Sequence, residues 1–167
     1  MITTLLLLAP FIVLMLIAAA WDLASYTIPN WIQLALLVAF VVFAVAVHMP
    51  ATTLVTHLLT ALTGLLLSLL LFSLRQLGGG DAKLFACTAL WFGFPDALQY
   101  ALAASILGGA LALALLTLRR FPLPNVLATQ PWISRLSAPT SGIPYGVALA
   151  AGAFIVLPYT ELFRRAI

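Results

Sequence analysis

Two aspartates stand out because the chain has only four acidic residues. Asp22 closes the first long apolar segment, and Asp81 follows three consecutive glycines and opens a later apolar segment. Two neighbouring carboxyl groups in a site with little water do not both ionise readily, so one keeps a proton while the other accepts one. Such a pair can activate a water molecule and protonate a leaving amine, which is the chemistry of amide hydrolysis by aspartic proteases.

Each aspartate also has a possible structural role, and that role suits Asp81 better than Asp22. Asp81 at a helix start would cap free N–H groups, but a cap does not explain the glycines at 78–80. Consecutive glycines suit a turn that a backbone or a substrate approaches closely. Asp22 near a helix end meets the negative end of the helix dipole, which disfavours its charge. By this dipole argument, and because Lys83 is near in sequence, we expect Asp81 rather than Asp22 to be the base.

The motifs of other hydrolases are missing from the sequence. It contains no His-Glu-x-x-His pattern of zinc proteases and no Gly-x-Ser-x-Gly pattern of serine hydrolases. His48 and His57 are expected near the opposite face of the membrane, without further metal ligands. Cys87 is the single cysteine, so we expect a small core residue and no internal disulfide. We therefore predict no metal and no cofactor, and no basic aromatic patch indicates nucleic-acid binding.

The composition indicates that the lipid bilayer surrounds this chain. Of its 167 residues, 65% are apolar and 7% are charged, whereas soluble domains have roughly 45–50% and 25%. A chain this short has too little interior to bury so much apolar surface, and disordered chains combine low hydrophobicity with high charge. The apolar segments are continuous rather than alternating, which favours helices over a transmembrane β-barrel.

Six apolar segments predict an all-α polytopic membrane protein, a single domain built as a bundle of six transmembrane helices. Their approximate ranges are 2–20, 30–48, 54–74, 82–94, 97–118 and 143–160. A span needs about 20 apolar residues, so 82–94 is short and a re-entrant segment is its alternative. The first segment has the alternative of a cleaved signal peptide, because three alanines at 18–20 resemble a cleavage site. The proline-rich stretch 121–141 is expected to be an extended loop, interfacial through Trp132.

The distribution of positive charge favours a full span for 82–94. With six spans, five cationic residues share one side of the membrane: Arg75, Lys83, Arg119, Arg120 and Arg135. Only Arg164 and Arg165 lie on the other side. Cytoplasmic loops carry an excess of Lys and Arg, so we expect both termini outside and the first set in the cytoplasm. The same crossings bring Asp22, Asp81 and Tyr145 to the cytoplasmic end.

Three short motifs carry a specific family resemblance. Asp22 is followed by Ile28-Pro29-Asn30, a later segment reads Gly78-Gly79-Gly80-Asp81-Ala82-Lys83, and the last begins with Pro144-Tyr145-Gly146. In order, spacing and six-span plan, these motifs resemble the type IV prepilin peptidase family of Gly-x-Gly-Asp intramembrane aspartic proteases. The short chain and the Pro-Tyr-Gly segment resemble the branch that serves Flp-type tight-adherence pili.

This resemblance implies a substrate, a location and a set of site residues. The substrate is a prepilin, whose short basic leader is cut at the cytoplasmic face of the bacterial inner membrane, after a Gly that precedes the pilin's apolar helix. Asp22 and Asp81 are implied as the catalytic pair, with other residues in supporting positions: Gly78 and Gly80 in the loop that presents Asp81, then Pro29, Asn30 and Lys83, and Pro144 and Tyr145 at the inner mouth. Larger members carry a zinc-binding cysteine cluster and N-methylate the new terminus. This chain has one cysteine and no such insert, so we expect neither zinc nor methylation.

Other functions stay open at this level. The chain could be a non-catalytic pilus-assembly subunit or a small proton-coupled transporter, in which the aspartates are structural or carry protons. The same peptidase chemistry could also act on other leaders, such as those of pseudopilins. Small residues at helical spacing, in Ala104-x-x-x-Gly108 and Gly146-x-x-x-Ala150, predict close helix packing within the bundle. They do not predict an oligomeric state.

Overall fold

A computed structural model describes residues 2–121, 129–138 and 141–166 of the chain, and these residues form helices and no strand. The fold is therefore the expected all-α bundle. The predicted loop at 121–141 lies partly outside the described residues, including its prolines at 122, 124 and 139.

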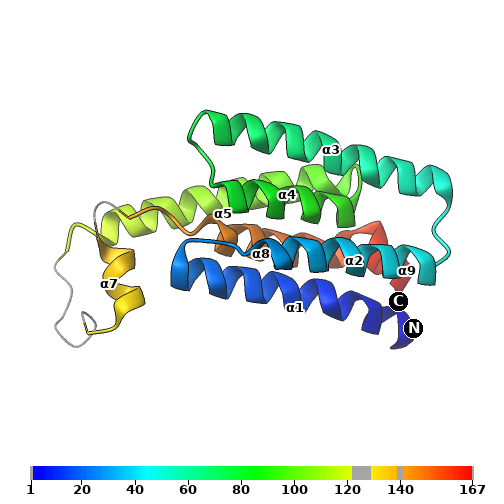
Figure 1. Ribbon diagram of the computed structural model, residues 1–167, viewed down its shortest axis with the longest axis horizontal. Helices are drawn as coiled ribbons and strands as arrows, with labels where there is room; N and C mark the ends of the chain where they lie inside the picture. Colours follow the sequence, from blue (N-terminus) through cyan, green and yellow to red (C-terminus); the bar gives the residue numbers. More distant parts are fainter. Residues whose placement is uncertain (1, 122–128, 139–140, 167) are drawn as a thin grey trace.

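Six helices correspond to the six predicted segments (Figure 1). They are α1 (Ile2–Ser25), α2 (Asn30–Ala46), α3 (Ala51–Ser73), α4 (Gly79–Phe92), α5 (Asp96–Leu118) and α8 (Tyr145–Val156). By length and composition three of them could cross a membrane, namely Leu6–Ser25 of α1, Ala51–Ser73 and Asp96–Leu118. Two more, α2 and the stretch Tyr145–Tyr159, are apolar but shorter.

Three smaller elements depart from the predicted plan. The expectation of extended chain is wrong at α7 (Pro131–Ser137), where the proline occupies the first turn and its missing N–H is not needed. The segment 143–160 is not one helix, since α8 ends at Val156 and a 3₁₀ turn, η1 (Leu157–Tyr159), follows around Pro158. The chain then forms α9 (Glu161–Ala166), whose Phe163 N–H donates to Thr160 Oγ1 at 3.2 Å.

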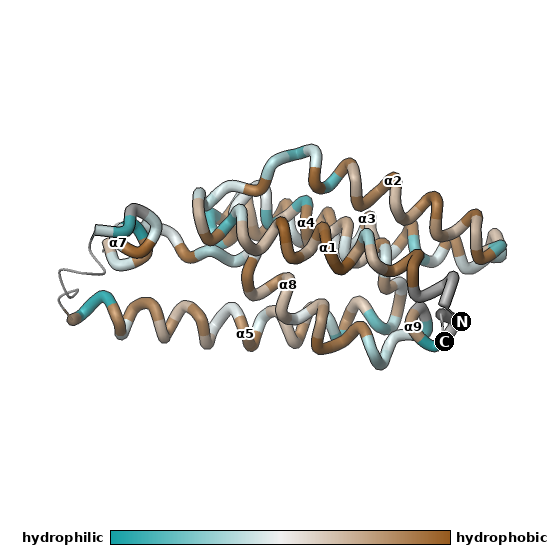
Figure 2. The backbone as a smooth tube through the Cα atoms, turned by 90° about the horizontal axis from the view of Figure 1, so that it is seen from below, coloured by the Kyte–Doolittle hydropathy of each residue, from teal (hydrophilic) through white to brown (hydrophobic). Residues whose placement is uncertain are grey.

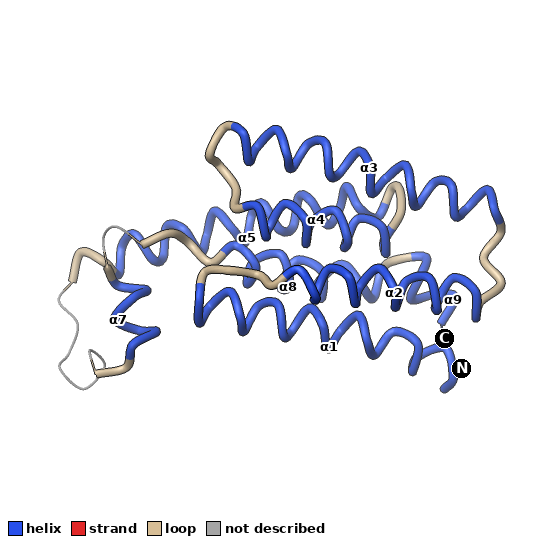
Figure 3. Tube along the Cα trace, in the orientation of Figure 1, coloured by secondary structure: helices blue, strands red, loops and turns tan. Residues whose placement is uncertain are grey.

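Consecutive helices run in opposite directions, so the connections alternate between the two ends of the bundle (Figure 3). We call the end that carries the α1–α2, α3–α4 and α5–α8 connections the motif end. Asp22 near the end of α1, Asp81 near the start of α4 and Tyr145 at the start of α8 line one cleft there. The two termini lie at the far end (Figure 1). This arrangement confirms the prediction that the crossings bring the three motifs together.

α4 lies at the centre of the bundle, where it packs against α2, α3, α5 and α8. Ten of its 14 residues are buried, so protein rather than lipid surrounds this short helix. The Trp91 ring packs on Phe11, Phe40 and Phe43, and its indole N–H donates to the Leu36 carbonyl at 3.0 Å. α4 runs antiparallel to α3 away from the motif end and does not turn back (Figure 1).

The far end of α4 is fixed by a glycine and a histidine. Gly93 has a φ of 66°, a backbone conformation that favours glycine, and a Cβ there would lie 2.9 Å from the His57 ring. His57 Nδ1 lies 2.7 Å from the Leu90 carbonyl oxygen, which links α3 to the last turn of α4. This histidine is therefore a packing residue, far from the motif end as expected.

Hydrophobic residues occur along the whole length of each long helix, whereas hydrophilic ones lie mainly in the connections (Figure 2). Large apolar side chains are exposed along the outer faces of several helices, as on α3 with Leu58, Leu62 and Leu66. A soluble domain does not expose such continuous apolar surface, so these faces fit a lipid environment.

Close packing of α5 on α8 confirms the prediction from small residues. A Cβ on Gly152 would lie 2.9 Å from the Ala104 backbone nitrogen, and a Cβ on Gly108 would lie 3.1 Å from the Tyr145 ring. The lack of a side chain at these positions lets the two helices approach closely, as is common between membrane helices.

Candidate active site

Asp22 lies in the last turn of α1, which runs past the predicted end at residue 20. The side chain is only 3% exposed, and its Oδ2 accepts a hydrogen bond from the Gly146 N–H at 2.7 Å. Tyr26 then ends the helix with a left-handed φ of 56°, while its N–H donates to the Asp22 carbonyl at 2.8 Å. The end of α1 is thus tied to the start of α8 through a carboxylate.

Asp81 is the third residue of α4 and is 8% exposed. Its Oδ1 atom is buried and has no hydrogen-bond partner within the described part of the chain. Gly78 is extended, with φ −71° and ψ 149°, and precedes the helix. Gly79 and Gly80 are already helical, so the expectation that Gly80 belongs to a loop is wrong.

The motif positions 78, 80 and 146 require glycine because other atoms occupy the space that a side chain would need. A Cβ on Gly78 would lie 2.6 Å from Asp81 Oδ2, and one on Gly80 would lie 3.2 Å from the Ile28 Cβ. A Cβ on Gly146 would lie 2.9 Å from Asp22 Oδ2 and 3.0 Å from the Ile28 Cδ1. Ile28 therefore touches both later motifs and links all three.

A cleft of about 910 Å³ at the motif end brings the two aspartates together. Both line it, as does Tyr145 at the start of α8, while the adjoining Pro144 is fully buried. Other lining residues come from the α1–α2 connection and from the ends of α3 and α5: Tyr26, Phe72, Ser73, Arg75 and Arg119.

The remaining predicted site residues lie beside the cleft rather than in its lining. Lys83 Nζ donates to Asn30 Oδ1 at 2.9 Å, so this ammonium group contacts the start of α2 and not Asp81. Pro29 is the residue that precedes α2, with φ −61° and ψ 141°. These three residues connect the second motif to the α1–α2 connection next to the cleft.

Two arginines hold the segment that leads into α8, and no sequence motif marked them. Arg119 donates from Nε to the Leu136 carbonyl (2.8 Å), from Nη1 to that of Ser141 (2.9 Å) and from Nη2 to that of Gly142 (2.7 Å). Arg135 Nη1 donates to the Ala24 carbonyl at 2.8 Å, near the end of α1. In the sequence these arginines indicated only the side of the membrane.

Tyr26 is another residue of the cleft that the sequence did not indicate. Burial raises the pKa of its phenol above the usual value, and the nearby Arg119 guanidinium acts in the opposite direction. The phenol is therefore neutral at pH 7 and contributes a dipole rather than a charge to the wall of the cleft.

The described residues contain no group of three or more His, Cys, Asp or Glu side chains that could hold a metal ion. Cys87 is buried, with its Sγ 3.8 Å from the Gln33 carbonyl oxygen, as expected for a small core residue. Asp96 lies at the far end, where its Oδ2 accepts a hydrogen bond from the Glu161 N–H at 2.8 Å.

Comparison with known proteins gives one informative result. No curated protein and no solved structure matches the chain. A family model, that of the type IV leader peptidase family, matches residues 9–113, which is more than half of the chain. The matched range contains Asp22, the Ile28-Pro29-Asn30 segment and Asp81. The chain therefore belongs to the type IV leader peptidase family.

Proposed function

We propose that this protein is an intramembrane aspartic endopeptidase that removes the short basic leader of Flp-type type IV prepilins. The observation that carries this proposal is the pair Asp22 and Asp81, both buried in the wall of one cleft, with Asp81 Oδ1 lacking a partner among the described residues. Buried carboxylate oxygens are nearly always hydrogen-bonded, so this atom is suited to share a proton or to bind a water molecule. Membership of the leader peptidase family supports the same reaction.

In this mechanism a water molecule held by the two carboxyl groups attacks the carbonyl carbon of the scissile peptide bond. The ionised aspartate accepts a proton from the water, and the protonated aspartate donates its proton to the reacting amide. Formation of the new C–O bond gives a tetrahedral intermediate, whose C–N bond then breaks. The leader keeps the new carboxyl group, and the released amine becomes the amino terminus of the mature pilin.

Hydrogen bonding suggests which aspartate is ionised. Each carboxyl group receives a backbone hydrogen bond, Asp22 Oδ2 from the Gly146 N–H and Asp81 from Gly78, but Asp81 Oδ1 has no donor among the described residues and is free to carry a proton. We therefore assign Asp22 as the base and Asp81 as the acid, the reverse of the assignment that the dipole argument favoured.

The other predicted site residues receive supporting roles in this proposal. Gly78 and Gly80 leave room for Asp81 and for Ile28. The Lys83–Asn30 hydrogen bond, next to Pro29, holds the start of α4 against the start of α2. Pro144 and Tyr145 begin α8 beside the cleft and direct the Gly146 N–H toward Asp22.

We also propose that the motif end faces the cytoplasm across the inner membrane of a bacterium. Cationic residues of the motif end, among them Arg75, Arg119, Arg120 and Arg135, support this orientation. Trp21 and Trp31 are about half exposed there and pack edge to face at 6.3 Å, as is typical of aromatic residues at a membrane interface. The α1–α2 connection is only residues 26–29, which supports a single domain without a zinc-binding or methylating insert.

The proposal is tested by leader cleavage of a co-expressed Flp-type prepilin with the variants Asp22→Asn and Asp81→Asn. Asparagine keeps the size of the side chain and removes its acid–base function, so we expect each variant to lose at least about 10³-fold in cleavage rate. The matched control is Asp96→Asn, which changes a buried aspartate at the far end and should leave cleavage intact.

The outcomes separate the candidate functions. Near-normal cleavage by a membrane-inserted Asp22→Asn or Asp81→Asn variant would show that the aspartate pair is not catalytic. If the unaltered protein cleaves pseudopilin leaders and not Flp-type ones, the chemistry stands and the substrate changes. If it cleaves no prepilin, pH-driven flux in vesicles tests the transporter alternative, and its absence leaves the assembly subunit.

A further inference from the structure

An apolar groove leads from the cleft along the side of the bundle, between α3 and α5. α3 packs on α4 and α5 packs on α8, but α3 and α5 are not a packed pair. A cavity of about 530 Å³ lies between them next to the cleft, and a second cavity of about 390 Å³ lies farther along. From Leu71 to Thr56 on α3 the groove extends about 22 Å, at 1.5 Å per residue.

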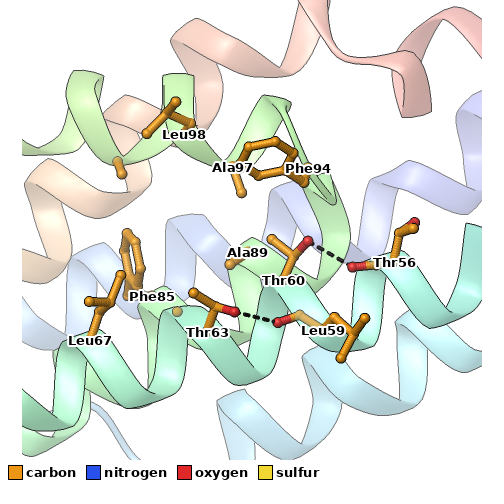
Figure 4. A pocket seen from close by; sticks show the side chains of 12 residues that line it. Thr56, Leu59, Thr60, Thr63, Leu67, Phe85, Ala89, Phe94, Ala97 and Leu98 are labelled. Carbon is orange, nitrogen blue, oxygen red and sulfur yellow. Dashed lines mark hydrogen bonds between the residues drawn. The ribbon is translucent and has the colours of Figure 1, made fainter.

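The cleft and the two cavities adjoin one another. The cleft and the first cavity share three lining residues, Gln76, Leu77 and Tyr145. The two cavities share another three, Leu67, Phe85 and Ala101. Figure 4 shows the second cavity, with Phe85 and Leu67 at one end and Phe94 at the other. A chain that leaves the cleft in this direction enters an apolar passage.

The Ser and Thr hydroxyl groups that line the groove already donate to carbonyls of the protein. Thr60 donates to the Thr56 carbonyl at 2.7 Å and Thr63 to that of Leu59 at 2.9 Å (Figure 4). The other hydroxyls do the same: Thr56, Ser68 and Ser105. Beyond Gln76 and Tyr145, which lie next to the cleft, a peptide in this groove must therefore satisfy its own backbone N–H and C=O groups, which an α-helix does.

Small residues make up most of the α5 wall of the groove, with Leu98 as the larger exception, so another helix can approach this wall. The small residues are Ala97, Ala101, Ala104, Ser105 and Gly109. A Cβ on Gly109 would meet nothing within 4 Å, so the groove is open at this position. Small residues favour close contact between membrane helices because they let the backbones approach.

We propose that this groove binds the apolar helix of the substrate, the segment that directly follows the scissile bond. The inference rests on the proposed function and names where that substrate lies. The scissile bond sits in the cleft in extended form, the leader remains among the polar groups of the motif end, and the helix continues along α3 and α5. A groove of about 22 Å accommodates about 15 helical residues, most of a membrane span.

Photo-crosslinking tests the groove without requiring catalysis. A photoreactive amino acid replaces Gly109, or the adjacent Ala110 as a control, in the Asp81→Asn variant co-expressed with the Flp-type prepilin. Gly109 and Ala110 are both exposed, but only Gly109 lines the groove. We expect crosslinks from position 109 to the apolar segment of the prepilin, and at least about fivefold fewer from position 110.

Cleavage kinetics give a second, independent readout. Gly109→Phe fills the groove without meeting protein atoms near its Cβ, so it should lower kcat/KM for full-length prepilin about tenfold. Ala110→Phe should leave kcat/KM unchanged. Both variants should cleave a short peptide that contains the leader and cleavage site, but lacks the apolar helix, at the rate of the unaltered protein.

The outcomes distinguish this inference from the proposed function. Crosslinks to prepilin from position 109, in a protein that cleaves no prepilin, would support the groove and overturn the peptidase proposal. Cleavage that is unaffected by Gly109→Phe, with no crosslink to prepilin, would overturn the groove and leave the peptidase. Crosslinks from position 109 only to lipid, or only to a second copy of this chain, would assign the groove to that occupant and overturn the inference.

Discussion

Gly146 shows how tightly the residues around Asp22 are packed. Its N–H donates to the Asp22 carboxylate at 2.7 Å, and an added Cβ would lie 2.9 Å from the same oxygen. The other neighbour, Ile28, is equally close and buried, so neither side leaves space for a methyl group. The backbone N–H of Gly146, a residue without a side chain, thus positions the Asp22 carboxylate.

We predict that Gly146→Ala lowers the rate of leader cleavage about 10–100-fold, because displacing a catalytic group by a fraction of an ångström has effects of this size. The measurement is the initial cleavage rate of prepilin in membranes. Ala110→Val is the control, since Ala110 is exposed and lines neither the cleft nor the groove, and it should cleave normally. Equal rates for the Gly146→Ala variant and the unaltered protein would show that this contact does not position the carboxylate.

The residues of the site were predictable from sequence to different degrees. Asp22 and Asp81 could be recognised because carboxylates are rare and costly near apolar segments. The reason for the glycines could not, since the atoms that approach Gly80 and Gly146 belong to Ile28 and Asp22, far away in the chain. Arg119 and Tyr26 were not predicted, because their contacts depend on how the ends of α1, α5 and α8 meet.

At the scale of elements, one side chain links the end of α5 to the segment that leads into α8. The Arg119 guanidinium donates to three carbonyls, two of which belong to the segment just before Pro144 and Tyr145. That segment orients the Gly146 N–H, which in turn contacts Asp22. Arg119 is thus a positioning residue that acts on the site through the start of α8.

We predict that Arg119→Gln lowers kcat for leader cleavage about tenfold with little change in KM, since the loss concerns position rather than binding. Arg119→Lys should not restore the rate, because a single ammonium group cannot replace the planar three-way contact of a guanidinium. Arg120→Gln is the control, as this neighbour is exposed and carries the same charge. An equal loss in the Arg120→Gln variant would indicate an effect of charge at the membrane surface instead.

The elements themselves were largely predictable, since long apolar segments bounded by Pro, Gly or charge leave few alternatives. The helices α2 to α5 begin and end within a few residues of the predicted ranges. The predicted boundaries are wrong where hydrogen bonds of side chains determine where a helix begins, ends or is held. α1 continues to Ser25, whose hydroxyl donates to the Trp21 carbonyl, and α9 begins at the Thr160 cap. α7 is held through Arg135 by a contact to Ala24, far away in the sequence.

For the whole molecule, the central position of α4 explains how a short helix can take part in a membrane bundle. Its 14 residues rise about 21 Å, less than the roughly 30 Å of a hydrocarbon core. Because ten of these residues are buried against other helices, lipid need not match the length of α4. The chain between Ala51 and Leu118 then comprises three antiparallel helices, which is an odd number of crossings.

This count leads to a prediction about topology. His48 lies in the α2–α3 connection and Gln130 next to α7, and both are exposed. We expect a cysteine at position 48 to react with a membrane-impermeant maleimide in spheroplasts, and one at position 130 only in inside-out vesicles. The unaltered protein is the control, because Cys87 is buried and should stay unlabelled. Labelling of both positions from the same side would mean an even number of crossings between them, hence an α4 that does not span. Labelling with the sides exchanged would place the aspartates outside the cell, where a cytoplasmic leader could not reach them, and would overturn the proposed orientation of the peptidase.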